Sequence, residues 1–144
     1  MSISDVLEAT TREAVLRCHG VLQELRPQLV DAEAFADQVM RQREAGYRLV
    51  YRERDGAVCA AAGFRVGENL AWGRFLYVDD LITGAAFRKQ GHAQAMMDFL
   101  YAEARRLGCG QVHLDSGVQR FDAHRLYLNA KMRITSHHFG IELA

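Results

Sequence analysis

The chain has 144 residues, of which 49% are hydrophobic and 25% are charged, so it holds enough apolar material for a single folded domain over residues 1–144. Its 18 basic and 18 acidic residues cancel, which argues against a strongly basic face for nucleic acid. The three cysteines are widely spaced and form no C-x-x-C pair, which excludes a disulfide framework and a four-cysteine zinc site.

The sequence also bears on where the protein resides. No apolar run reaches the roughly 18 residues that a membrane span needs, so we expect no membrane partner. Residues 1–13 carry acidic side chains early and lack the apolar core of a signal peptide. We therefore expect a cytoplasmic protein whose cysteines are reduced.

The first elements in chain order are a strand and two helices. Residues 2–9 can form a short strand. Apolar residues then recur at three- and four-residue steps from Thr11, which predicts a helix that stops at Pro27. Asp31 is a good N-cap for a second helix, which ends at Gly46.

The middle of the chain reads as antiparallel strands. Residues 47–53 alternate as a half-buried strand does, and residues 57–66 form the predicted returning strand. Asp55-Gly56 between them is typical of a hairpin turn. Residues 67–69 supply another turn signal, which leads into a long strand over residues 70–83. These patterns predict consecutive hairpins.

The last part of the chain changes period at Gly84. Residues 91–107 form a strongly amphipathic pattern that predicts a helix, followed by a short strand over 111–115, a helix over 122–131 and an extended segment over 132–143. Early hairpins and one late β-α-β crossover predict an α+β fold. It would have a central, mostly antiparallel mixed sheet of about six or seven strands flanked by about four helices.

The most specific segment is Arg88-Lys-Gln-Gly91-His-Ala93, where a strand and a loop lead into the amphipathic helix. The first N–H groups of a helix lack internal partners, and a glycine lets an anion approach the backbone closely. The residues alone therefore allow either a diphosphate site or an ordinary glycine-containing helix start. A nucleoside triphosphatase P-loop and a Rossmann fingerprint do not fit the spacing.

This segment resembles the Arg/Gln-x-x-Gly-x-Gly/Ala signature of the GNAT superfamily of acyl-CoA-dependent N-acetyltransferases. The preceding strand with Asp79-Asp80-Leu81 resembles the fourth strand of that superfamily. The segment Asp122-Ala-His-Arg-Leu-Tyr127 resembles the Ala-x-x-x-Tyr element of its later helix. The resemblance covers about residues 70–139 and implies a GNAT-like fold whose fourth and fifth strands splay apart.

The resemblance implies a site for acetyl-CoA as co-substrate. The diphosphate would accept hydrogen bonds from backbone N–H groups, while Arg88 orients the loop and the pantetheine pairs with the fourth strand as an extra strand would. Ser116 is either a pantetheine or acceptor contact or a turn residue, and His124 is either a CoA contact or a solvated helix residue. The backbone groups for the diphosphate belong to Lys89, Gln90, Gly91, His92 and Ala93, and those for the pantetheine to Leu81, Ile82 and Thr83.

Transfer of an acetyl group from a thioester to an amine needs a neutral amine, a polarised carbonyl and a proton for the departing thiolate. The resemblance implies that Tyr127 is the general acid, and its alternative is core packing beside Ala123 and Ala130. A carboxylate, Asp79 or Asp80, would be the base directly or through water. Because neighbouring strand residues face opposite sides, at most one of the two should face the substrate, and the alternative is a bond to strand backbone.

Other reactive residue types do not combine into a site. His113 and Asp115 share a predicted strand face, but no histidine pair has helical ligand spacing, so we predict no metal. Cys109 lies between glycines without a nearby base, which argues against a covalent acyl-cysteine.

The hypothesis is an enzyme that moves an acetyl group from acetyl-CoA directly to a primary amine of a small-molecule or peptide acceptor. A non-catalytic acyl-CoA-binding regulatory domain is the main alternative, and a nucleotide-phosphate binder is a weaker one. The acceptor is not encoded in any recognisable motif. A homodimer through the late strands is a further hypothesis.

Overall fold

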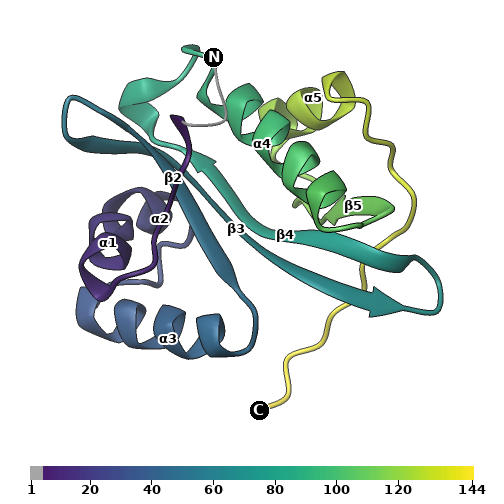
Figure 1. Cartoon of the computed structure of the whole chain (residues 1–144), viewed down its shortest axis with the longest axis horizontal. Coiled ribbons are helices and arrows are strands. Elements are labelled where there is room, and N and C mark those ends of the chain that lie inside the picture. Colours follow the sequence, from purple (N-terminus) through teal and green to yellow (C-terminus); the bar gives the residue numbers. More distant parts are fainter. Residues whose placement is uncertain (1–4) are drawn as a thin grey trace. The chain divides into compact units, whose positions relative to one another are not determined.

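The computed structural model describes residues 5–144, which divide into a unit ending at Leu114 and a second unit, Asp115–Ala144 (Figure 1). The predicted α+β class is confirmed. Across the described residues there are five α-helices and one five-stranded sheet, so the expected six or seven strands and four helices are wrong in number. The prediction of a single domain over residues 1–144 stays a prediction.

The first helical region consists of α1 (Arg12–Arg17), α2 (His19–Leu25) and α3 (Ala32–Glu44). One helix was expected before Pro27, but Cys18 leaves the helical ladder and ends α1 while starting α2. Asp31 caps α3 as predicted, because its side chain accepts hydrogen bonds from the N–H groups of the second and third helical residues at 3.0 and 3.1 Å.

The sheet runs in chain order: β1 (Leu7–Glu8), β2 (Arg48–Arg54), β3 (Ala57–Asn69), β4 (Gly73–Thr83) and β5 (Gln111–Leu114). The first four strands pair antiparallel, and β5 pairs parallel with β4. Asp55 and Gly56 both have positive φ, which is the hairpin turn that the sequence predicts.

Two strand predictions are corrected. Residues 67–69 were expected to turn, but β3 continues through them because Gly67 pairs with Phe75 and Asn69 with Gly73. The turn instead falls at residues 70–72. Residues 132–143 were expected to form a strand, but they have no regular secondary structure and pair with no described strand. Of the strand expected at residues 2–9, residues 2–4 lie outside the described part of the chain.

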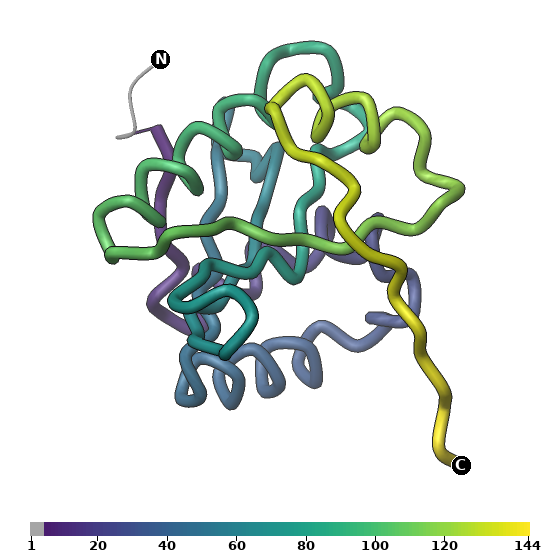
Figure 2. The backbone as a smooth tube through the Cα atoms, turned by 90° about the vertical axis from the view of Figure 1, so that its right-hand side faces the viewer, coloured from purple at the N-terminus to yellow at the C-terminus, as the bar shows by residue number. Residues whose placement is uncertain are grey.

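The helices of the first unit cover both faces of the sheet. The structure has α4 (His92–Arg106) and α3 on opposite sides of the strands (Figure 2). On the α1–α3 side lies a core that includes Val15, Leu22, Phe35, Leu49 and Ile82. On the side of α4, its apolar stripe is buried at Met96, Met97 and Leu100.

A bulge in β4 breaks its alternation. Gly63 of β3 pairs with Asp80, whereas the next residue, Phe64, pairs with Val78, so Asp79 is the extra residue on β4. The pairing of β4 with β5 ends at Val78 and Leu114, although β4 continues to Thr83. Among the described strands, the last part of β4 therefore has a ladder partner on the β3 side alone.

The second unit contains α5 (Phe121–Asn129), whose buried side chain is Tyr127. Ala130 ends this helix and Lys131 follows in the left-handed region, with φ of 68°. The N–H of Met132 then donates to the carbonyl of Tyr127 at 3.0 Å, which closes the helix end.

Candidate active site

Both aspartates of β4 line one pocket of about 480 Å³, which corrects the expectation that at most one could face a substrate. The bulge at Asp79 is the physical reason, because an extra residue resets the alternation of side chains between the two faces. The pocket is walled by the end of α2, by α3 and its C-cap, by the residue before β2, and by the strands β3 and β4. Its lining is Arg26, Gln42, Ala45, Tyr47, Arg65, Asp79 and Asp80.

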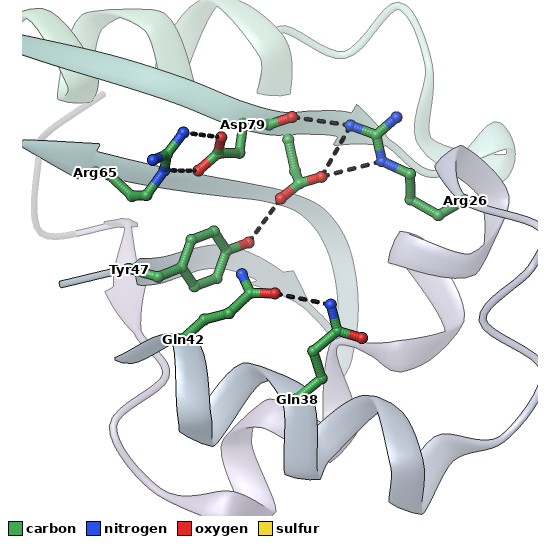
Figure 3. Close-up of polar contacts among 7 residues, drawn as sticks. Arg26, Gln38, Gln42, Tyr47, Arg65 and Asp79 are labelled. Atoms are coloured by element: carbon green, nitrogen blue, oxygen red, sulfur yellow. Dashed lines mark hydrogen bonds and ion pairs between the residues drawn. The ribbon is translucent and has the colours of Figure 1, made fainter. Parts of the chain in front are cut away.

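Asp80 is held from two sides, by Arg26 and by Tyr47, whose side chains Figure 3 labels. The Nε of Arg26 donates to its Oδ1 at 3.1 Å, and the hydroxyl of Tyr47 donates to its Oδ2 at 2.8 Å. Arg26 also donates from Nη2 to the backbone carbonyl of Asp79 at 2.9 Å. The guanidinium therefore ties the carboxylate of one aspartate to the backbone of the other and fixes the bulge.

Asp79 forms a two-point ion pair with Arg65, which is also visible in Figure 3. The Nε and Nη2 of Arg65 donate to the two carboxylate oxygens at 2.6 and 2.8 Å. The guanidinium also lies over the ring of Tyr77, 5.5 Å from its centroid. Arg65 is thus oriented by an anion and by an aromatic face.

Tyr47 is buried, and its pKa is raised by burial and by the neighbouring carboxylate of Asp80. Its phenol therefore stays protonated and acts as a hydrogen-bond donor. The ring can reach Asp80 because residue 63 of β3 is glycine, and a Cβ there would overlap the hydroxyl and ring of Tyr47. A glycine inside a strand marks a close approach of another group.

The start of α4 has the features of an anion site. Gly91, its N-cap, has φ of 84° and makes no side-chain capping bond, and Lys89 also lies in the left-handed region with φ of 63°. The loop carries Arg88, Lys89 and Gln90 as exposed or half-exposed residues. The uncapped N–H groups at this helix start suit a diphosphate.

The backbone and the side chain of His92, which the sequence places at this loop, lie in different surroundings. Its backbone N–H belongs to the start of α4, but its side chain is buried, with Nδ1 3.6 Å from the Sγ of Cys59. Burial lowers its pKa, so the imidazole is neutral at physiological pH. A ligand at this loop would thus meet the backbone of His92 and not its imidazole. Gln90 of the same loop accepts a hydrogen bond at its Oε1 from Arg54 at 3.3 Å.

Leu81, Ile82 and Thr83 form the part of β4 beyond the end of its pairing with β5. Their side chains are largely covered, and on the other side they pair with Ala62, Ala61 and Ala60 of β3. An edge of this kind can pair with a strand-like partner. The assignment of the pantetheine arm to it stays a prediction.

The second unit holds the other predicted residues. Burial raises the pKa of Tyr127, against the opposing effect of Arg120, so the phenol keeps its proton at neutral pH. The Oγ of Ser116 is buried and lacks a hydrogen-bond partner among residues 5–144, which fits a contact with a ligand. The Nε2 of His124 is 2.9 Å from the carbonyl oxygen of Gly117, so that nitrogen is occupied within the loop.

Within residues 5–144, no three or more His, Cys, Asp or Glu side chains gather where they could hold a metal ion. His113 instead stacks on Trp72, with ring centroids 3.5 Å apart. None of the described helices is both long and apolar enough to cross a membrane.

Sequence reasoning missed Arg26, Tyr47, Gly63 and Arg65, which shape the pocket around the two aspartates. They come from the end of α2, from the residue before β2 and from β3, so no local motif joins them. The one available signal was Gly63, a glycine inside a predicted strand.

Comparison with known proteins decides the family. The Acetyltransferase (GNAT) family model matches residues 10–131. The chain belongs to the GNAT family of acetyltransferases. The chain is 32% identical over 130 residues, 89% of each protein, to the uncharacterized N-acetyltransferase YhdJ of Bacillus subtilis (strain 168). The predicted resemblance and the acyl-CoA-dependent N-acetyltransferase class are confirmed.

Solved structures of this family have the same fold. The ribosomal-protein-alanine N-acetyltransferase of Brucella melitensis biovar Abortus 2308 has a TM-score of 0.83 at 16% identity, over 96% of this chain and 99% of that one. Aminoglycoside N-acetyltransferase AAC(6')-Iy in complex with CoA has a TM-score of 0.84 at 12% identity, over 96% and 93%. At such identities the likeness concerns the GNAT fold alone.

Proposed function

We propose that this GNAT protein transfers an acetyl group from acetyl-CoA directly to a primary amine bound in the pocket of Asp79 and Asp80. The observation that carries the proposal is the bulge of β4, which brings both carboxylates to one pocket beside the unpaired edge of Leu81–Thr83. The acceptor amine and the thioester of acetyl-CoA would meet along this strand.

The binding roles follow from the loop and strand geometry. The N–H groups of Lys89–Ala93 would hold the diphosphate, with Arg88 adding positive charge, and the edge of Leu81–Thr83 would pair with the pantetheine. The buried hydroxyl of Ser116 would add a hydrogen bond to the bound ligand. His124 would be a further contact with CoA. Acetyl-CoA supplies an activated acetyl group as a thioester.

The chemical roles follow from the pKa directions and contacts. Asp80 would take a proton from the acceptor ammonium, directly or through water, while Tyr47 and Arg26 orient its carboxylate. A backbone N–H of Leu81 or Ile82 would polarise the carbonyl. As the C–N bond forms and the C–S bond breaks, Tyr127 would give its proton to the thiolate, because its raised pKa keeps it protonated. The second proton that the nitrogen loses as the amide forms would return to the Tyr127 oxygen through water.

The Tyr127 assignment is tested by two substitutions. Tyr127→Phe keeps the ring, and loss of a general acid should lower kcat by about 10²–10⁴-fold. Acetyl-CoA affinity and Tm should change little. The measurement is thiol release from acetyl-CoA in the presence of an amine found active in a library screen.

Tyr127→Ala serves as the comparison, because loss of a buried ring should lower stability by about 3–5 kcal/mol. If Tyr127→Phe turns over at the wild-type rate while Tyr127→Ala unfolds, Tyr127 is a packing residue and the proton comes from water. If acetyl-CoA binds and no amine releases thiol, the non-catalytic acyl-CoA-binding domain is the better description.

A further inference from the structure

The charged side chains of the pocket differ in how much they are exposed. The side chains of Asp80 and Asp79 are 18% and 25% exposed, whereas those of their partners Arg26 and Arg65 are 43% and 53% exposed. Each aspartate side chain is thus largely covered, and each arginine side chain is more than twice as exposed as the aspartate side chain it pairs with. An approaching molecule meets positive charge before it meets negative charge.

The acids of the pocket are also already engaged. Both oxygens of Asp79 accept from Arg65, and the oxygens of Asp80 accept from Arg26 and Tyr47. Two guanidiniums balance two carboxylates in the lining, so the pocket has no surplus of negative charge for a polycation. A polyamine would have to break ion pairs that the fold has formed.

The arginines still have donors to offer. A guanidinium carries five N–H donors, and the contacts with Asp79 and Asp80 use the Nε and Nη2 of both Arg26 and Arg65. Within residues 5–144, the Nη1 groups of both remain for a ligand. Arg65 is the more exposed, and its position is fixed by Asp79 (Figure 3) and by the ring of Tyr77.

We propose that the acceptor is an amine that also carries a carboxylate, an amino acid or an amino-acid-like zwitterion, and that Arg65 pairs with this carboxylate. This inference rests on the proposed function, because Asp80 must take the proton of the same molecule's ammonium. The volume of about 480 Å³ is within the range of small-molecule pockets, about 300–1,000 Å³. Arg65 is then a specificity residue, and Asp79 positions it.

The experiment compares matched acceptors. Thiol release from acetyl-CoA is measured with an α-amino acid and an ω-amino acid, with the carboxamide of each, and with spermidine as a polycation. A charge-assisted pair with an arginine predicts a kcat/KM at least about tenfold higher for one amino acid than for its carboxamide. Equal or higher kcat/KM for the carboxamides or for spermidine would overturn the inference.

Substitution at Arg65 identifies the anchor. Arg65→Gln should abolish the preference for the carboxylate, with little effect on the carboxamide or on acetyl-CoA affinity, and Arg65→Lys should restore part of it. Arg12→Gln is the control, because Arg12 pairs with Glu33 and Asp37 on the surface and should leave the preference unchanged. An equal loss on acid and amide in Arg65→Gln would contradict the assignment.

A binding measurement separates this inference from the proposed function. If no amine releases thiol, calorimetry on the CoA-saturated protein compares the same amino acids with their carboxamides. If an amino acid binds to the wild-type protein and not to Arg65→Gln, the carboxylate site is supported and the proposed catalysis is rejected. No difference between acid and amide in wild-type protein would reject the carboxylate site whether or not the protein is active.

Discussion

At the scale of single residues, the pocket depends on the absence of a side chain at position 63. Tyr47 lies against β3 at Gly63 and from there donates to Asp80 at 2.8 Å. A hydrogen bond to a charged group contributes about 1.5–3 kcal/mol, and an unsatisfied buried hydroxyl costs a similar amount. Position 63 therefore cannot carry even the methyl group of alanine unless the ring of Tyr47 moves.

Gly63→Ala should expel the Tyr47 ring and break its bond to Asp80. We expect a loss of about 1–3 kcal/mol in the free energy of unfolding and a lower kcat/KM for the amine, with acetyl-CoA affinity unchanged. Urea unfolding and steady-state kinetics measure both. Gly20→Ala in α2 is the control, since a Cβ there meets nothing within 4 Å. If both variants unfold at the same urea concentration, the close approach of Tyr47 does not matter.

At the scale of elements, the start of α4 is built for an anion by its backbone. Gly91 has a positive φ that favours glycine, and nothing lies within 4 Å of where its Cβ would be. Conformation, not space, therefore explains the glycine. The uncapped N–H groups of this helix start can donate hydrogen bonds either to a carboxylate of the chain itself or to a phosphate of a ligand.

Gly91→Asp should place a carboxylate where we propose that the diphosphate binds. The negative charge of the aspartate stabilises the N-terminus of α4 in the protein without ligand, so the fold should persist. The same charge repels the diphosphate, so acetyl-CoA affinity should fall at least about tenfold. Gly91→Asn is the matched control, because asparagine tolerates positive φ and adds no charge. Calorimetry that finds Gly91→Asp and Gly91→Asn equally tight would remove this loop from the acetyl-CoA site.

At the scale of the whole molecule, one buried carboxylate links α4 to two strands of the first unit. Glu103 accepts from Arg48 of β2 at 2.5 Å and from Arg106 at 2.6 Å, and Arg48 also donates to Glu8 of β1 at 2.7 Å. The hydrogen bonds from Arg106 and Arg48 lower the pKa of Glu103 to about 2. The ionised form is therefore favoured by folding.

A folded pKa below the unfolded value gives stability that is present above about pH 4.5 and is lost as pH falls toward 2. Between pH 5 and 2, wild-type protein should lose about 2–3 kcal/mol more unfolding free energy than Glu103→Gln, which has no carboxylate to protonate. Urea unfolding across this range gives the difference. Glu33→Gln, at an exposed ion pair, should keep the wild-type slope, and the same slope for Glu103→Gln would contradict the assignment.

Much of the architecture is legible in local patterns. The caps at Asp31 and Gly91, the Asp55-Gly56 hairpin and the stripe of α4 each depend on residues within one or two turns of one another. Such short-range chemistry acts the same way wherever the chain goes. For that reason the α+β class and the family signature at Arg88–Ala93 were predictable, whereas the break between α1 and α2 and the irregular backbone of residues 132–143 were not.

The amino-acid sequence by itself determined the fold class, the family and most of the helices and strands. Only the tertiary structure decided that Asp79 and Asp80 share a pocket, because a bulge arises from the register between β3 and β4 and not from either strand alone. The same holds for Arg26, Tyr47 and Arg65, which are up to 54 positions from the aspartate that each one contacts. Their positions depend on how the sheet and helices pack, since local pattern carries no information about contacts that distant in the chain.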